Sequence, residues 1–276
     1  MNARTSIGLG LRWARKRAGM TQEELASAAR VPQSTVARIE RGNALPRTAT
    51  LMALLNATGH ELVVERNIGS EFDPEPIRQM LRLDPWVRVR RGLAAATSGR
   101  RRGRRSHDPI RILRRLRRYA VRFVLIGEMA ESAWGSSTAV PPVVAVCHAQ
   151  DRESLGRLEV ALADLEVTSL PDRATLESSV PLVLTCPAGT LRLEPRPGDP
   201  SDGYEVLART ATRILVATGL LVVVASLEDL VRLRRGRSTR EDREALELLG
   251  VVRAELADWN PWRRPERPAA AESATV

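Results

Sequence analysis

Four polar side chains lie on the outward face of a short predicted helix, where they can form hydrogen bonds with a partner. They are Gln33, Ser34, Thr35 and Arg38. Val36 and Ile39 point the opposite way, three residues apart, as on an amphipathic helix. A second short helix precedes this one across a tight turn. Such a pair, whose second helix carries small polar and basic side chains, is typical of a protein that presents a helix to the major groove of DNA.

Helix signals in the surrounding sequence place these residues in a predicted bundle. Gly19 ends a first amphipathic helix, and Thr21 with Glu24 three residues later forms a capping box at the start of the second. The third helix is predicted from about Gln33 to Arg41. A fourth helix over residues 48–58 closes the core with its leucines.

Residues 6–65 resemble the helix-turn-helix family of the phage-repressor and Cro type, often called the XRE family, through the run MTQEELA…VPQSTVARIERG. In this family the second helix of the pair lies in the major groove. The resemblance implies that double-stranded DNA is the partner and that the protein is a homodimer on paired half-sites. It also implies a phosphate contact at Gln22. The implied base readers, through contacts of glutamine with adenine, arginine with guanine and threonine with the thymine methyl group, are Gln33, Ser34, Thr35 and Arg38.

A competing interpretation makes the polar start of the third helix a merely solvated surface. It requires the whole two-helix pattern to be a coincidence, so we favour the DNA-binding interpretation. The acidic Glu40 on the same helix is interpreted as structural rather than base-reading. Its candidate partners are Arg38, Arg41 and Arg47.

The charge of the chain favours a polyanionic partner. The chain has 276 residues, 43% of them hydrophobic, and a formal charge of +10. Nucleic acid is the first candidate for a protein of this charge. However, Lys16 is the only lysine, and an arginine bias of this kind also follows from a GC-rich genome. The basic run from Arg100 to Arg105 therefore has two open interpretations, contact with DNA phosphates and a solvated linker.

Several features indicate a soluble cytoplasmic protein without a membrane partner. Cys147 and Cys186 are isolated thiols, as in a reduced compartment, and no histidine pattern suggests a metal site. No signal peptide opens the chain. The longest apolar run, Ile214 to Ala225, is too short to span a bilayer and is interpreted as a buried strand. We expect neither a metal nor a cofactor.

Shifts in composition divide the chain into four segments. Residues 1–66 are predicted as the DNA-binding domain and residues 67–108 as a helical and basic linker. Residues 109–258 are predicted as a second domain and residues 259–276 as a flexible tail. The expected fold class is α+β multidomain, with an all-α helix-turn-helix bundle followed by a mixed α/β domain.

Strand and helix signals alternate in the second domain. Strands are expected at residues 121–126, 142–147, 182–186, 191–194 and 220–224. Helices are expected at residues 109–118, 127–135 and 151–165, with a helix, a basic loop and another helix after residue 225.

This order resembles the nucleotidyltransferase fold of the DNA polymerase β type over residues 109–256, through VLIG, WGS and the tail VASLEDLVRLRRGRSTREDREAL. The chemistry of that family needs an Asp-x-Asp pair on one strand face and a third carboxylate on a neighbouring strand, which together hold two divalent cations. Carried over by position, the three carboxylates fall at Pro142, Val144 and Arg192. None of these side chains supplies the oxygen ligands that such cations require.

The glycines of the second domain have two interpretations. The resemblance implies that Gly127, Gly135 and Ser136 are remnants of a phosphate-binding loop, with Glu128 in place of a second glycine. The simpler interpretation is that tight turns of an inherited fold require these glycines. We favour the simpler one and expect no catalytic residue and no enzyme activity.

The leading prediction is a sequence-specific DNA-binding transcriptional regulator. Its catalytically inactive nucleotidyltransferase-like domain would sense a ligand or mediate dimerisation. One alternative is an antitoxin-type autoregulator, with a toxin as its protein partner. The other is an active nucleotidyltransferase that is targeted to nucleic acid.

Overall fold

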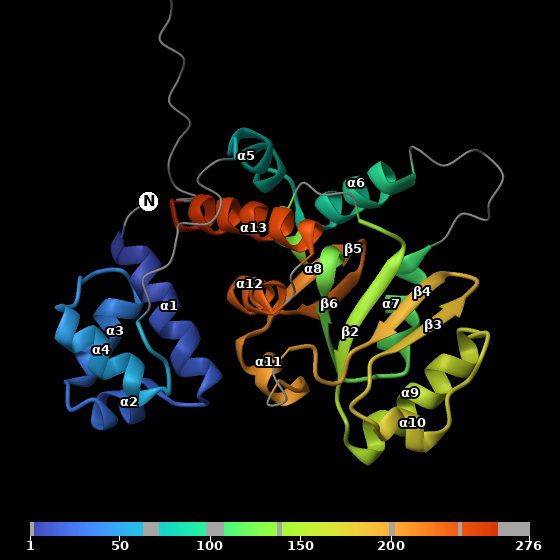
Figure 1. Cartoon of the computed structure of the whole chain (residues 1–276), viewed down its shortest axis with the longest axis horizontal. Helices are drawn as coiled ribbons and strands as arrows, with labels where there is room; N and C mark the ends of the chain where they lie inside the picture. The colour runs from blue at the N-terminus through green and yellow to red at the C-terminus, as the bar shows by residue number, and fades with distance from the viewer. Residues whose placement is uncertain are drawn as a thin grey trace, which may run out of the picture.

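The computed structural model describes residues 3–62, 72–97, 108–136, 140–198, 202–236 and 239–258. Figure 1 shows an all-helical N-terminal unit, coloured blue, beside a larger unit that is built around one sheet. The chain therefore has the helical head and the mixed sheet-and-helix domain that the sequence predicts. The predictions for residues 98–107 and 259–276, which include the basic run and the tail, lie outside the described residues.

Four helices form the N-terminal unit: α1 (Ala3–Arg17), α2 (Gln22–Ala28), α3 (Gln33–Glu40) and α4 (Thr48–Ala57). Three of them, α2, α3 and α4, begin at the predicted residues. Burial of an apolar side chain contributes about 1.5–3 kcal/mol to stability. In this small unit the buried core consists of Leu11, Leu25, Ala26, Val36, Ile39 and Leu54.

The C-terminal unit has a six-stranded sheet in the order β3-β4-β2-β1-β6-β5. Its strands are β1 (Phe123–Ile126), β2 (Val143–His148), β3 (Leu182–Cys186), β4 (Gly189–Leu193), β5 (Thr212–Ala217) and β6 (Leu220–Val224). The central β1 runs antiparallel to β2 and parallel to β6, and β2 runs parallel to β4. All four residues of β1 are buried, as expected of a strand that is covered on both faces.

Helices pack against this sheet and against its edges. They are α7 (Pro109–Arg118), α8 (Gly127–Trp134), α9 (Arg152–Asp164), α10 (Arg173–Glu177), α11 (Tyr204–Thr210), α12 (Leu227–Arg235) and α13 (Arg240–Asp258). In Figure 1, α7 runs behind β2 and β4, which it contacts. The helix α12 packs against α8 and α13, and α1 of the N-terminal unit contacts α11 and α13.

Two helices of the predicted linker belong to the core of the C-terminal unit. They are α5 (Glu75–Leu81) and α6 (Pro85–Thr97), which contact α13 and α8 respectively. Ile77, Leu81 and Val89 are buried in the same apolar cluster as the sheet. The guanidinium of Arg88 adds hydrogen bonds of 2.9–3.0 Å to four backbone carbonyls, one of them that of Ala133 on α8.

The apolar run from Ile214 to Ala225 is a hairpin rather than one strand. Its two arms are β5 and β6, and Gly219 lies in the turn with φ +69°. The interpretation of this run as a single strand was wrong, because a glycine in the left-handed region reverses the chain there. The helices α10 and α11 were not predicted. None of the described helices is long and apolar enough to cross a membrane.

Candidate nucleic-acid interface

The start of α2 is fixed by the predicted capping box. The backbone N–H of Glu24 donates to Oγ1 of Thr21 at 3.1 Å, and the N–H of Thr21 donates to Oε2 of Glu24 at 2.6 Å. The backbone hydrogen bond with Thr21 lowers the pKa of Glu24 below its ordinary value. The box therefore sets where α2 begins and satisfies two amides that helix formation leaves unpaired.

The turn between α2 and α3 depends on a residue in the left-handed region. Arg30 has a φ of 54°, which is uncommon for a residue other than glycine. The amides of Arg30 and Val31 donate to the carbonyls of Ser27 and Ala26 at 3.2 and 2.9 Å, which closes the end of α2. Pro32 then caps α3 with extended backbone, as its fixed φ allows. These bonds set the entry of the chain into α3.

The end of α3 is fixed by a close approach of α1. A Cβ at Gly8 would lie 2.3 Å from the backbone carbonyl oxygen of Ile39. Only glycine leaves room for the two backbones to meet there. The position of α3 therefore depends on a glycine of α1.

The side chains of α3 divide into an inner and an outer set, as predicted. Val36, Ala37, Ile39 and Glu40 are buried. On the outer face Thr35 is half-buried, and Gln33, Ser34 and Arg38 are exposed. The guanidinium of Arg38 makes no hydrogen bond or ion pair within the described part of the chain. The structure therefore brings all four predicted base readers to one surface.

A chain of polar contacts connects this surface to α1. Both side-chain oxygens of Glu40 accept from Arg15, at 2.6 and 2.9 Å. Oε2 of Glu40 also accepts from Nε2 of Gln22 at 2.8 Å, and Oε1 of Gln22 accepts from Nε2 of Gln33 at 3.1 Å. The amide of Gln33 keeps a second N–H and its own oxygen, the two groups that a bidentate contact with adenine uses. Gln33 is thus oriented before any partner arrives.

Glu40 is structural, as predicted, but its partner was not among the arginines considered. Burial opposes its ionisation, yet hydrogen bonds from Arg15 and Gln22 and the nearby positive charges outweigh this, so the pKa of Glu40 is lowered. Arg41 turns back to the carbonyl of Ala37 instead. Sequence reasoning missed Arg15 because it lies 25 residues before Glu40 on another helix.

The side chain of Gln22 is not free to contact a phosphate with its whole amide. It is half-buried, and both atoms of its amide are engaged by Glu40 and Gln33. The role that the structure shows for Gln22 is to hold the side chain of Gln33. A contact with phosphate would use its remaining N–H and stays a prediction.

Residues 11–62 match the helix-turn-helix family model. The match spans α2, the left-handed turn and α3, and it ends beyond α4. The surface of Gln33, Ser34, Thr35 and Arg38 therefore belongs to the second helix of a helix-turn-helix pair, the one that enters the major groove in such proteins. No curated protein matches the chain.

The positions where carboxylates were expected occupy neighbouring strands but do not converge. Val144 is fully buried in β2 opposite Leu191, whereas Arg192 lies opposite Ala145, so Val144 and Arg192 point to opposite faces of the sheet. Pro142 precedes β2, and its carbonyl accepts from the N–H of Thr190. The positions counted along the chain therefore do not share one face, and a shift of one residue in β2 would be needed to bring them together.

Gly127 lies at the junction of β1 and α8. The side chains of Ala145 and Arg192 lie closest to it. A Cβ at Gly127, which has φ +69°, would lie 3.3 Å from Cβ of Ala145 and 3.5 Å from Nη2 of Arg192. Arg192 is ion-paired with Glu194. Neither side chain that faces Gly127 is a carboxylate, so the corrected register also supplies no metal ligand.

The space beside Gly127 is filled by an ionic cluster around Arg234. Its guanidinium binds Glu131 at 2.7 Å, Asp242 at 2.7 Å and Glu128 at 3.0 Å. Burial raises the pKa of Glu128, but the charge of Arg234 outweighs this and the pKa is lowered. The remaining cavity measures about 10 Å³. That is about the space of one water molecule and far less than a nucleotide needs.

Gly135 and Ser136 at the end of α8, the alternative phosphate-loop remnant, are enclosed. Gly135 has φ +121°, and a Cβ there would lie 2.7 Å from Cδ2 of Leu81. Ser136 is 1% exposed. Gly135 lies against Leu81 of α5 and Arg88 of α6, so the turn interpretation of Gly135 agrees with its surroundings. Among the described residues, no group of three or more metal-ligating side chains comes together.

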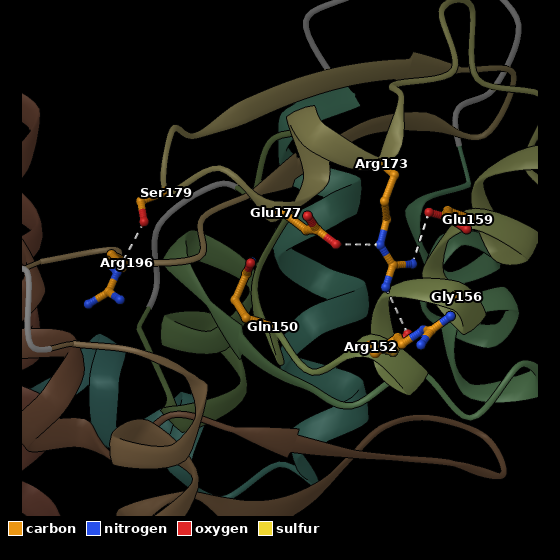
Figure 2. A pocket seen from close by; sticks show the side chains of 8 residues that line it. All are labelled: Gln150, Arg152, Gly156, Glu159, Arg173, Glu177, Ser179 and Arg196. Atoms are coloured by element: carbon orange, nitrogen blue, oxygen red, sulfur yellow. Dashed lines mark hydrogen bonds and ion pairs between the residues drawn. The ribbon is translucent and has the colours of Figure 1, made fainter.

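A larger cavity of about 910 Å³ opens beside α9 and α10 and is shown in Figure 2. Arg173, one of the arginines that line it, is held by Glu177 at 2.8 Å, Glu159 at 3.0 Å and the carbonyl of Arg152 at 3.0 Å. Arg196 donates to Ser179 at one edge of the cavity (Figure 2). Both glutamates that line the cavity are thus ion-paired with Arg173.

Proposed function

We propose that this protein is a sequence-specific DNA-binding transcriptional regulator. The observation that carries the proposal is the polar chain from Arg15 through Glu40 and Gln22 to Gln33, which orients an exposed side chain at the start of α3. Orienting a base reader in advance reduces the entropy that binding would otherwise cost. A merely solvated helix surface has no need of such support.

The proposed roles follow from side-chain chemistry. Gln33 contacts adenine, Arg38 contacts guanine, and Thr35 packs on a thymine methyl group, with Ser34 as a further donor or acceptor. Arg41 and Arg47 are exposed on either side of the loop after α3, and we assign them contacts with phosphates. The proposed location is the cytoplasm, where such a regulator meets DNA.

One helix-turn-helix reads only a few base pairs, so we propose that the protein acts as a homodimer on two half-sites. The C-terminal unit is proposed as an inactive nucleotidyltransferase-like domain that dimerises or senses a ligand. The filled space beside Gly127, whose nearby carboxylates Glu128 and Glu131 are ion-paired with Arg234, supports inactivity. Light scattering on the purified protein tests the dimer, and incubation with labelled nucleotide and magnesium tests the inactivity.

The experiment for the main proposal is selection of bound duplexes from a random library, followed by gel-shift assays on the enriched sequence. A single enriched motif that is bound in preference to arbitrary DNA supports the proposal. Recovery of no motif would overturn it. The antitoxin alternative predicts in addition a toxin gene beside this one and a stable complex with its product.

A further inference from the structure

The helix α7 has one buried side and one strongly basic side. Its ten residues include five arginines and no acidic residue. Ile112, Leu113 and Leu116 are fully buried against the sheet. The exposed residues Arg111, Arg114, Arg117 and Arg118 have no carboxylate partner within the described part of the chain.

Three other arginines on α7, α9 and α10 are ion-paired. Arg115, the remaining arginine of α7, binds Asp164 of α9 at 3.1 Å. Arg157 of α9 binds Glu153 at 2.6 Å, and Arg173 of α10 binds two glutamates. An arginine-rich composition explains how many arginines the chain has. It does not explain why four neighbouring ones on a single helix are left without carboxylates.

A residue of α6 extends this surface. Arg90 lies over the ring of Trp86, 5.1 Å from its centroid, which orients the guanidinium. Arg90 and Arg114 line the same groove of about 320 Å³ between α6, α7 and the β5–β6 turn, together with Asp108, whose carboxylate caps the start of α7. The exposed arginines of α7 together with Arg90 are called the basic face below.

The spacing of the basic face suits a phosphate backbone. Arg111, Arg114 and Arg118 follow the i, i+3, i+7 pattern and therefore share one side of α7. They span about 10 Å along the helix axis, at about 1.5 Å per residue. One strand of duplex DNA carries a phosphate every 3.4 Å or so of axial rise, so about three phosphates fall within that span.

We propose that the basic face binds the phosphate backbone of duplex DNA without sequence preference, as a second contact in addition to α3. The choice of DNA as occupant rests on the proposed function. In Figure 1 the N-terminal unit and α7 lie on opposite sides of the molecule, so the second contact engages a separate segment of duplex.

Other polyanionic partners fit this surface less well. Single-stranded nucleic acid is held by exposed aromatic rings on which bases stack, whereas Arg90 covers the ring of Trp86. A membrane surface is bound by helices that insert an apolar face, and the apolar face of α7 is committed to the core.

The test compares two triple variants of the full chain that lose the same charge. One is Arg111→Ala with Arg114→Ala and Arg118→Ala. The control removes three exposed arginines away from α7, Arg82→Ala with Arg240→Ala and Arg243→Ala. Binding of a fluorescent duplex of arbitrary sequence is measured as a function of salt. The α7 variant is expected to reduce the slope of log affinity against log salt by about 2.7, since each lost phosphate contact removes about 0.9.

A capture assay separates this contact from α3. Protein bound to an immobilised duplex should capture a second, labelled duplex, and the α7 variant should lose that capture while still binding the first duplex. Equal effects of the α7 and control variants, or retained capture by the α7 variant, would overturn the proposal. An effect confined to single-stranded RNA or to anionic vesicles would also overturn it. The α3 variant Arg38→Ala tests the proposed function separately, because it should change base preference, a property that a contact of the basic face without sequence preference does not set.

Discussion

Arg17, the last residue of α1, lies with its Nη1 2.6 Å from Oδ1 of Asp229 on α12, and this contact joins the helix-turn-helix to the sheet domain. The same guanidinium binds Asp202. Arg232 binds both carboxylates, and Ser226 donates to Asp229 at 2.6 Å. Both aspartates are fully buried. A buried charge without its partner is costly, so the head is held in one orientation on the C-terminal unit.

Removal of Arg17 should therefore destabilise the protein strongly. Arg17→Ala leaves Asp202 and Asp229 to share Arg232, and we expect the free energy of unfolding to fall by about 3–5 kcal/mol, the usual cost of breaking a buried pair. Chemical denaturation measures it. The control is Arg122→Ala, whose partners Asp151 and Glu205 are exposed, with an expected loss below about 1 kcal/mol. Equal losses in the two variants would contradict the joining role of Arg17.

The approach of α1 to α3 makes a second prediction. Gly8→Ala pushes a methyl group against the carbonyl of Ile39, and we expect a loss of about 1–3 kcal/mol, the usual cost of overpacking. Gly10 in the same helix has open space around its Cβ position. Gly10→Ala should therefore be neutral or stabilise by up to about 1 kcal/mol. Thermal unfolding of the two variants measures the difference in stability. A Gly8 variant as stable as the Gly10 variant would refute the packing argument.

His148 makes stability depend on pH. Burial lowers its pKa to about 4, although a backbone hydrogen bond with Leu176 opposes the change. The neutral ring accepts a hydrogen bond at Nε2 from Gln150 at 2.9 Å. As the pH falls, the unfolded chain takes up this proton first, since its histidine has a pKa near 6.5. The stability that the neutral ring provides is therefore complete above about pH 6.5 and is lost as the pH falls towards 4.

The matching measurement compares unfolding free energies of the native chain and His148→Asn across this range. We expect their difference to change by about 3 kcal/mol between neutral pH and about pH 4. This follows because the pKa of His148 is about 6.5 in the unfolded chain and about 4 in the folded one, and lowering a pKa by one corresponds to about 1.4 kcal/mol. A difference that stays constant with pH would show that His148 is not held neutral by burial.

The sequence predicted α2, the turn and α3 well because each is set by local signals. Thr21 with Glu24, and the alternation of Val36 and Ile39 with exposed neighbours, act within a few residues of where they occur. The partner of Glu40 could not be found in this way. Arg15 reaches it only after α1 has packed across α3, and no pattern in the sequence records that approach.

The second domain shows the same limit more strongly. Arg17 and Asp229 are 212 residues apart, and their contact depends on how two folded units meet. The one-residue shift that turns Val144 away from Arg192 is set by pairing between β2 and β4, which a count from Gly135 does not determine. The helices α10 and α11 are short and lie in segments without clear periodicity.

The central claim is that the exposed side of α3 reads DNA bases, and selection of duplexes from a random library with the native chain and with Arg38→Ala tests it most directly. We predict one enriched motif for the native chain. The variant should lose preference at one base position, with a weakening at the best site of about 1–3 kcal/mol, the discrimination that a bidentate arginine–guanine contact provides. No enriched motif, or the same motif and affinity for both proteins, would contradict the account.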